Sequence, residues 1–392
     1  MLNQTFQPKE LVKLASQSEI IKFDLGGTEQ DILNSITKIS YAVSQVDFSF
    51  TDIKCSVYKG KNVYETDNVN EHFAIKKLNA IIKRLYTVKY TNRNEILTQL
   101  IQVLNDGTNY KIIRADIKDF FETVPRKKLI DKLKSDSILG SLMINKLLDL
   151  DKYLAKQSCK GLPRGISLSP ALSEIYLRRF DKSMRSNTNV YYYARYVDDI
   201  IIVCLDRLED VENLLKENIK DLGLSFNHKY KVIPEVNVFN DFDYLGVNFK
   251  FGLNKIEYSL SKNKVNQIKT RIIKSLIDFS KNKNEKLLLN RIIFLTSNYN
   301  VYTKTESNNL KAGIYYNNQH INTYQALNDL NEFLRKSITA KRGSLARKTK
   351  LIPPSVASQC MKNCFFKGYI EKRMMDFNGV DISEIVRCWK YE

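Results

Sequence analysis

Two apolar runs that meet at a pair of aspartates dominate the hydrophobic pattern of this chain. An aromatic and apolar run at 190–197 leads into Asp198 and Asp199, and a β-branched run at 200–205 follows them. Both compositions are typical of strands. The pattern therefore predicts a hairpin with the two aspartates at its tip. A second apolar segment predicts a strand that ends at Asp116.

Elsewhere, apolar residues recur at the spacing of helices. This period predicts a helix at 94–104 and further helices between 125 and 157. Another helix should begin at Ser169-Pro170, since serine caps helices and proline suits their first position. Residues 71–93 are expected to hold strands, and residues 58–68 a polar loop or a hairpin.

Asp116, Asp198 and Asp199 are candidate metal ligands. Adjacent carboxylates at an exposed turn repel each other, and a cation such as Mg²⁺, which prefers oxygen ligands, would neutralise them. Phosphoryl transfer by two metals needs carboxylates that bridge ions about 3.5–4 Å apart. For the pair of aspartates alone, an acidic β-turn is the alternative interpretation. Asp119 is interpreted as a solvated or locally capping residue.

The order of these segments resembles the motifs of reverse transcriptases. Residues 116–121 are similar to their motif A, 161–177 to motif B, 196–199 to motif C and 242–247 to motif E. Residues 73–93 resemble the fingers motifs. Five motifs in the family's order form a specific signal, whereas one alone would be weak.

The resemblance implies an α+β fold, the right-hand polymerase, with fingers, a palm whose antiparallel sheet is flanked by helices, and a basic helical thumb or carboxy-terminal domain. The expected domains are an amino-terminal extension at 1–54, fingers at 55–115 with part of 122–160, a palm at 116–255 and the basic helical domain at 256–392.

The resemblance also implies roles for individual residues. Two Mg²⁺ ions, with Mn²⁺ as a substitute, would lie at Asp116, Ile117, Asp198 and Asp199. Phe121 would exclude a 2′-hydroxyl and so select dNTPs over ribonucleotides. Lys231, favoured over Lys229, would protonate the leaving pyrophosphate. The other nucleotide-binding residues would be Lys76, Lys77, Arg84, Arg164 and Gly165. Primer and template would contact Ser169, Tyr196, Val197, Tyr244, Leu245, Gly246, Lys341, Arg342, Arg347 and Lys348.

Charge agrees with a polyanionic partner. The 392 residues carry a formal net charge of +19, and residues 261–392 hold 24 Lys and Arg against 10 Asp and Glu. The amino terminus lacks an apolar leader, and no apolar run is long enough to span a membrane. A cytoplasmic location is therefore expected, and the resemblance to bacterial reverse transcriptases implies a bacterial cell.

Arg164 stands where retroviral and group II intron enzymes have glutamine, and this departure resembles bacterial abortive-infection and defence-associated reverse transcriptases. The resemblance implies an RNA-directed DNA polymerase that acts in antiphage defence with a dedicated non-coding RNA. A retron-type enzyme, a protein-primed or untemplated DNA polymerase and a non-catalytic RNA-binding scaffold are the alternatives. Its partners would be the RNA template, the DNA product and dNTPs, and a homo-oligomer or a partner protein stays open.

Overall fold

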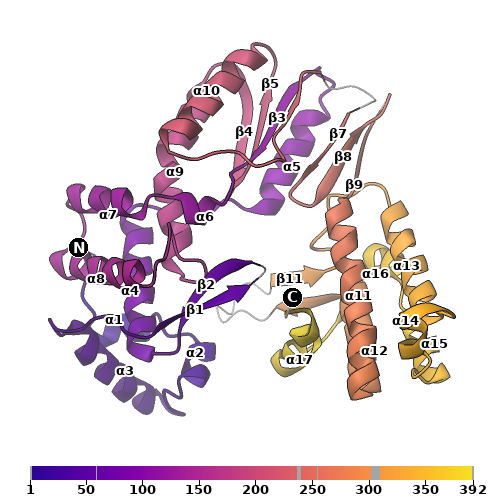
Figure 1. Cartoon of the computed structure of the whole chain (residues 1–392), viewed down its shortest axis with the longest axis horizontal. Coiled ribbons are helices and arrows are strands. Elements are labelled where there is room, and N and C mark those ends of the chain that lie inside the picture. The colour runs from indigo at the N-terminus through magenta and orange to yellow at the C-terminus, as the bar shows by residue number, and fades with distance from the viewer. Residues whose placement is uncertain (1, 59, 236–239, 254, 302–309, 391–392) are drawn as a thin grey trace. The chain divides into compact units, whose positions relative to one another are not determined.

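The computed structural model of the chain divides into two compact units (Figure 1). The first comprises residues 1–96 and 109–235, and the second 97–108 and 236–392. The structure describes residues 2–58, 60–235, 240–253, 255–301 and 310–390.

A four-stranded antiparallel sheet forms the centre of the first unit. Its strands, in spatial order, are β4 (Val190–Tyr196), β5 (Asp199–Cys204), β3 (Lys111–Asp116) and β6 (Lys231–Ile233). In β5 every residue after Asp199 is buried, which suits an inner strand covered on both faces. The two strands and the hairpin predicted at 190–205 are confirmed, as is the strand that ends at Asp116.

Helices α9 (Leu168–Ser186) and α10 (Leu208–Asp221) lie beside this sheet (Figure 1). Contacts join α9 to β4 and to α10. The predicted capping residue of α9 was wrong. The helix begins at Leu168, and Ser167 rather than Ser169 occupies the capping position. Ser169 already lies inside the helix, where its hydroxyl is buried and donates to the Pro163 carbonyl at 2.6 Å.

The strands expected at 71–93 are absent, since the described residues there form the helix α4 (Val69–Leu85). The Asn68 side chain accepts hydrogen bonds from the first turn of α4, and an apolar face that includes Leu78 and Ile82 is buried. The strands lie before the helix instead. β1 (Ile53–Tyr58) and β2 (Lys61–Thr66) form an antiparallel hairpin.

The remaining helices of the first unit surround α4 or link the strands. The amino-terminal helix α3 packs on α4, and the helices predicted between 125 and 157 are confirmed as α7 and α8. The bounds are α1 Pro8–Val12, α2 Gln17–Lys22, α3 Glu29–Ser44, α6 Phe120–Thr123, α7 Arg126–Ser135 and α8 Ser141–Lys156. The predicted helix at 94–104 is α5 (Arg93–Leu104), which runs from the first unit into the second.

The second unit combines a three-stranded antiparallel sheet with a mainly helical region. Leu245 and Gly246, both at positive φ, form the two-residue turn between β7 and β8. The sheet contains β7 Asp241–Tyr244, β8 Val247–Phe251 and β9 Ile256–Leu260. The helices are α11 Lys262–Asn282, α12 Glu285–Thr296, α13 Gln325–Ile338, α14 Gly343–Thr349, α15 Pro354–Lys362, α16 Phe365–Ile370 and α17 Gly379–Lys390.

A second, smaller sheet of this unit pairs β10 with β11 and β12. Most buried apolar residues of α11, α12 and α13 belong to one core. These strands are β10 Asn298–Val301, β11 Leu310–Gly313 and β12 Met374–Met375. Throughout the described residues, none of the helices combines the length and the apolar character needed to cross a membrane.

Candidate active site

Three aspartates meet at one end of the sheet of the first unit. Asp116, the last residue of β3, is the cross-strand partner of Asp199, the first residue of β5. Tyr196 pairs with Asp199 on the other side, so Val197 and Asp198 form a two-residue turn. The Ile117 amide donates to the Asp198 carbonyl at 3.1 Å and fixes this turn against β3. Segments about 80 residues apart in sequence are thereby joined, as antiparallel pairing allows.

The carboxylates are close enough to repel one another. Burial and the charge of Asp116 raise the pKa of Asp198. Burial raises the pKa of Asp199 to about 6, with the Arg114 guanidinium acting against this shift and Asp116 and Asp198 adding to it. Clustered, partly buried carboxylates with raised pKa values are a common property of functional sites.

Side chains of neighbouring elements neutralise two of the three carboxylates. Lys229 Nζ lies 2.8 Å from Asp116 Oδ2, and the Asn227 amide donates to the other oxygen of Asp116. Arg114 Nη2 lies 2.9 Å from Asp199 Oδ1. Within the described part of the chain, the Asp198 carboxylate takes part in no ion pair.

The donor chemistry of this site fits a divalent cation, because the carboxylates supply the oxygen ligands that Mg²⁺ prefers. Among the described residues, however, no group of three or more His, Cys, Asp or Glu side chains closes around a metal position. Lys229 and Asn227 hold both oxygens of Asp116. A cation bound by Asp116 would share these oxygens with the two side chains or displace them, since a carboxylate offers about four acceptor sites.

A cavity of about 550 Å³ opens at Asp116 and Asp198 and is lined by several cations. Lys61 comes from the β1–β2 hairpin, Lys118 follows β3, and Arg164 precedes α9. The ammonium of Lys61 is paired with Asp119, so Asp119 has a specific partner rather than solvent alone. Three cations beside three carboxylates can hold a phosphorylated substrate next to a metal site.

The lysines of α4 predicted to bind nucleotide lie elsewhere. Lys76 pairs with Glu19 of α2, and Lys77 is buried, with its ammonium 3.2 Å from the Asn3 carbonyl. Because α4 is a helix and not a pair of strands, these side chains face the amino-terminal segment. Arg84 is exposed near the end of α4. The cavity at the carboxylates includes none of the three.

Arg164 contacts the predicted gate residue. Its Nε and Nη2 donate to Glu122 at 2.6 and 3.1 Å, and its guanidinium carbon lies 5.1 Å from the centre of the Phe121 ring. The hydrogen bonds that Arg164 donates to Glu122 hold the pKa of Arg164 above its ordinary value. Phe121 is half-buried beside this pair, while Phe120 is fully buried and belongs to the core, as predicted.

Gly165 and Ser169 were predicted to approach the template or the nucleotide. In the structure, local packing accounts for glycine and serine at these two positions. Gly165 has φ +90°, and a Cβ there would lie 2.4 Å from the Tyr64 carbonyl oxygen of β2. Glycine is therefore needed for close packing of the β1–β2 hairpin. Ser169 is buried, and its hydroxyl donates to the Pro163 carbonyl.

The aspartate turn holds a strained residue. Val197 has φ +59°, a region that β-branched residues rarely adopt. Its carbonyl accepts a hydrogen bond from Arg195 Nη1 at 2.8 Å. The same guanidinium is buried and bonded to Glu174 and Asp181 of α9 at 2.7 Å each. Arg195 therefore ties the turn that carries Asp198 to α9.

Two lysines were considered as the general acid. Lys229 forms an ion pair with Asp116, whereas Lys231 is an exposed residue of β6. The geometry therefore favours Lys229, against the sequence-based preference.

Tyr196 and Val197 are half-buried beside the carboxylates. The predicted hairpin Tyr244–Gly246 and the basic residues Lys341, Arg342, Arg347 and Lys348 belong to the second unit, where Lys341, Arg342 and Arg347 are exposed.

Some contributors to the site were missed from the sequence. Arg114 lies two residues before Asp116 on the same strand, so the period of a strand could have indicated it. Lys61 and Asn227 come from a separate hairpin and a loop, and neither position has a local signal that points to Asp116.

Comparison with known proteins identifies a family that part of the chain resembles. A family model described as reverse transcriptase (RNA-dependent DNA polymerase) matches residues 70–249. No curated protein matched the chain. Together with the helix-flanked antiparallel sheet, the family match confirms the predicted α+β right-hand polymerase class.

Several solved structures are similar at low identity. Telomerase from Candida albicans with a TWJ fragment of telomeric RNA is 13% identical, with a TM-score of 0.40, and the match covers 90% of this chain and 64% of that chain. Truncated apo telomerase from Candida tropicalis is 14% identical, with a TM-score of 0.39 and coverages of 53% and 54%. A partial Cas6-RT-Cas1–Cas2 complex is 21% identical, with a TM-score of 0.27 and coverages of 56% and 41%.

Proposed function

We propose that this chain is an RNA-directed DNA polymerase, because residues 70–249 match the reverse transcriptase family model, and that it copies RNA into DNA at Asp116, Asp198 and Asp199. The observation that carries the proposal is the meeting of these carboxylates at the ends of paired strands. Reverse transcriptase domains generally use divalent metals, and we propose Mg²⁺, with Mn²⁺ as a substitute. Bound ions of this kind lower the pKa of the primer hydroxyl and offset charge on the leaving pyrophosphate.

The chain's own residues prepare this chemistry. Arg114 and Lys229 limit the repulsion between the carboxylates until a cation binds. Lys61, Lys118 and Arg164 face the same cavity and would hold the triphosphate. Lys229, whose ammonium lies 2.8 Å from Asp116, would be the donor of a proton to the departing pyrophosphate.

Phe121 would act as the sugar gate of this site. Replacing Phe121 with valine should raise the use of ribonucleotides relative to dNTPs by about tenfold or more, because the ring that excludes the 2′-hydroxyl is lost. Competing single-nucleotide incorporation measures this ratio. The matched control is Phe180→Val, which removes a buried ring of α9 outside the cavity and should lower stability while leaving sugar selectivity unchanged. Unaltered selectivity in Phe121→Val would rule out the gate.

The biological setting is a further part of the proposal. We propose that this polymerase acts in the bacterial cytoplasm, in antiphage defence, on a dedicated non-coding RNA. What supports this is the similarity of motif B, with Arg164 in place of glutamine, to defence-associated reverse transcriptases. A retron-type enzyme or a protein-primed, untemplated polymerase is the second candidate.

Sequencing of all nucleic acid that copurifies with the chain from its native host tests this setting. One discrete RNA together with its complementary DNA would support a dedicated template, provided that the DNA is missing from an Asp198→Ala sample. DNA of low-complexity sequence attached to protein would favour the protein-primed branch. RNA without DNA in either sample would favour a non-catalytic scaffold, and phage protection that survives Asp198→Ala would exclude a polymerase-based defence.

A further inference from the structure

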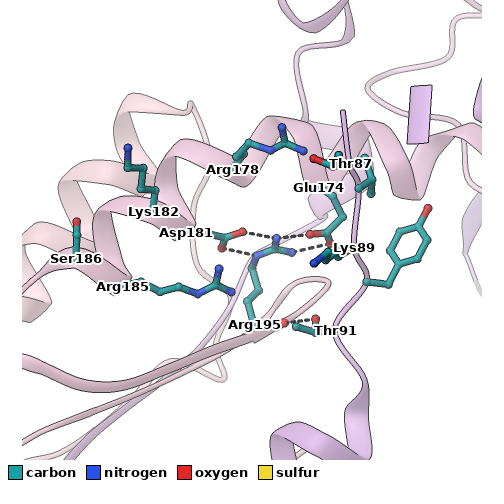
Figure 2. Close-up of a pocket in the computed structure, with 12 residues that line it drawn as sticks. Thr87, Lys89, Thr91, Glu174, Arg178, Asp181, Lys182, Arg185, Ser186 and Arg195 are labelled. Atoms are coloured by element: carbon teal, nitrogen blue, oxygen red, sulfur yellow. Dashed lines mark hydrogen bonds and ion pairs between the residues drawn. The ribbon is translucent and has the colours of Figure 1, made fainter. Parts of the chain in front are cut away.

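A second basic cavity lies in the first unit, between α9 and the segment 87–91 (Figure 2). Its volume is about 610 Å³, and it shares no residue with the cavity at the carboxylates. Five basic and two acidic side chains line it. A cleft lined mainly by one sign of charge raises the local concentration of ligands of the opposite charge, so this lining favours an anionic ligand.

The two acidic residues of the groove share one cationic partner. Glu174 and Asp181 are both held by the buried guanidinium of Arg195, as Figure 2 shows. One guanidinium offsets one of their two negative charges, and the other four cations of the lining still leave an excess of positive charge for an incoming anion. Lys89 and Lys182 are exposed, and neither forms an ion pair within the described part of the chain.

The cations follow one face of α9. Arg178, Lys182 and Arg185 recur at helical spacing, and Figure 2 shows them in a row along the helix. Their backbone positions span about 10 Å, because a helix rises 1.5 Å per residue. A row of this length exceeds one phosphate group and suits a chain of phosphates.

An aromatic ring completes the groove. Tyr90 lines it and is 48% exposed, with Lys83 Nζ 4.9 Å from the centre of its ring. Proteins that bind single strands without sequence preference combine a basic groove along the backbone with exposed rings on which bases stack. Thr87 and Ser186 add hydroxyl groups to the lining.

We propose that this groove binds a stretch of single-stranded nucleic acid of two or more nucleotides. The phosphates would contact Lys182 and its neighbours on α9 and Lys89 across the groove, and a base would stack on Tyr90. A strand is favoured over a free nucleotide because the cations form a row. This site is separate from the carboxylates, and binding there does not depend on DNA synthesis.

Fluorescence anisotropy of the full chain with a 5′-fluorescein-labelled 12-nucleotide oligouridine tests the proposal, in EDTA and without dNTPs. The Lys89→Gln/Lys182→Gln variant should bind about tenfold more weakly, and its slope of log affinity against log salt should be shallower by about 1.4, since two phosphate contacts are lost. The matched control Arg179→Gln/Lys220→Gln removes the same charge from α9 and α10 outside the groove. Equal losses in the two variants would overturn the proposal, because they would reflect net charge alone.

Two more measurements locate the strand. Oligouridine that contains 4-thiouridine should crosslink to the peptide that holds Tyr90, and the crosslink should fall in the groove variant but persist in the control. UTP at the same nucleotide concentration should displace the oligomer poorly. Equal displacement would show that the groove binds a mononucleotide and not a strand. Asp198→Asn should bind oligouridine normally, which separates failure of this site from failure of the proposed polymerase.

Discussion

Replacing Asp198 with asparagine is expected to reduce DNA synthesis on an RNA template by about a thousandfold or more, without lowering the melting temperature. The substitution keeps the shape of the side chain and removes its charge. Asp198 is the carboxylate without an ion pair in the described residues, so its charge is the one most dependent on a bound cation. Primer extension with a defined RNA template and Mg²⁺ measures the first effect.

The unchanged or higher melting temperature follows from the raised pKa of Asp198. A carboxyl whose pKa is higher in the folded chain than its ordinary value of about 3.9 is less stable when charged in the folded state than in the unfolded state. Its favourable contribution is present below the ordinary pKa and is lost as pH rises through the folded value. At pH 7.5 asparagine removes this cost, so loss of activity cannot be attributed to unfolding.

Asp119 provides the matched control. It lines the same cavity and pairs with Lys61, yet it lies outside the paired strand ends. Asp119→Asn breaks one exposed ion pair and should change synthesis by about fivefold at most. Full activity in Asp198→Asn, or an equal loss in Asp119→Asn, would contradict the assignment of the catalytic carboxylates.

The strand ends that carry these aspartates could be predicted because their signal is local. The β-branched run of β5 and the aromatic run of β4 each fix a strand within a few residues, and two short strands with a two-residue gap predict a hairpin. The helix α4 also had a local signal, since Leu78 and Ile82 recur at helical spacing. The expectation of strands at 71–93 followed the similarity to fingers motifs and not this helical spacing, and it was wrong.

The partners of the aspartates could not be predicted in the same way. Lys61 reaches the site because the Tyr64 amide of β2 donates to the Arg164 carbonyl at 2.7 Å, which docks the hairpin on the segment before α9. That contact depends on a loop conformation about 100 residues away, for which one sequence has no periodic signal. The sequence could not decide between Lys229 and Lys231 for the same reason, because the loop before β6 determines which lysine faces Asp116.

Replacing Arg195 with methionine is expected to destabilise the first unit by about 3 kcal/mol or more. The guanidinium is 3% exposed and is held by Glu174 and Asp181. Burial acts to lower the pKa of Arg195, but hydrogen bonds to the two carboxylates raise it well above its ordinary value. Without the guanidinium, two partly buried carboxylates lose their counter-charge. The free energy lost by leaving them unpaired exceeds the net stabilisation that the ion pairs contribute. Urea denaturation measures this loss, and the control Arg179→Met, an exposed arginine of the same helix, should change stability by less than about 1 kcal/mol.

The same substitution should also lower kcat by about tenfold at temperatures where the variant is folded, because the Val197 carbonyl loses the bond that holds its strained backbone. Adding Val197→Gly tests this role directly. Glycine adopts φ near +59° without strain, so the double variant should regain part of the lost kcat while its stability stays low. If Arg195 were only structural, the double variant would regain no kcat. If kcat changed only in proportion to the folded fraction of the protein, other contacts would position the turn.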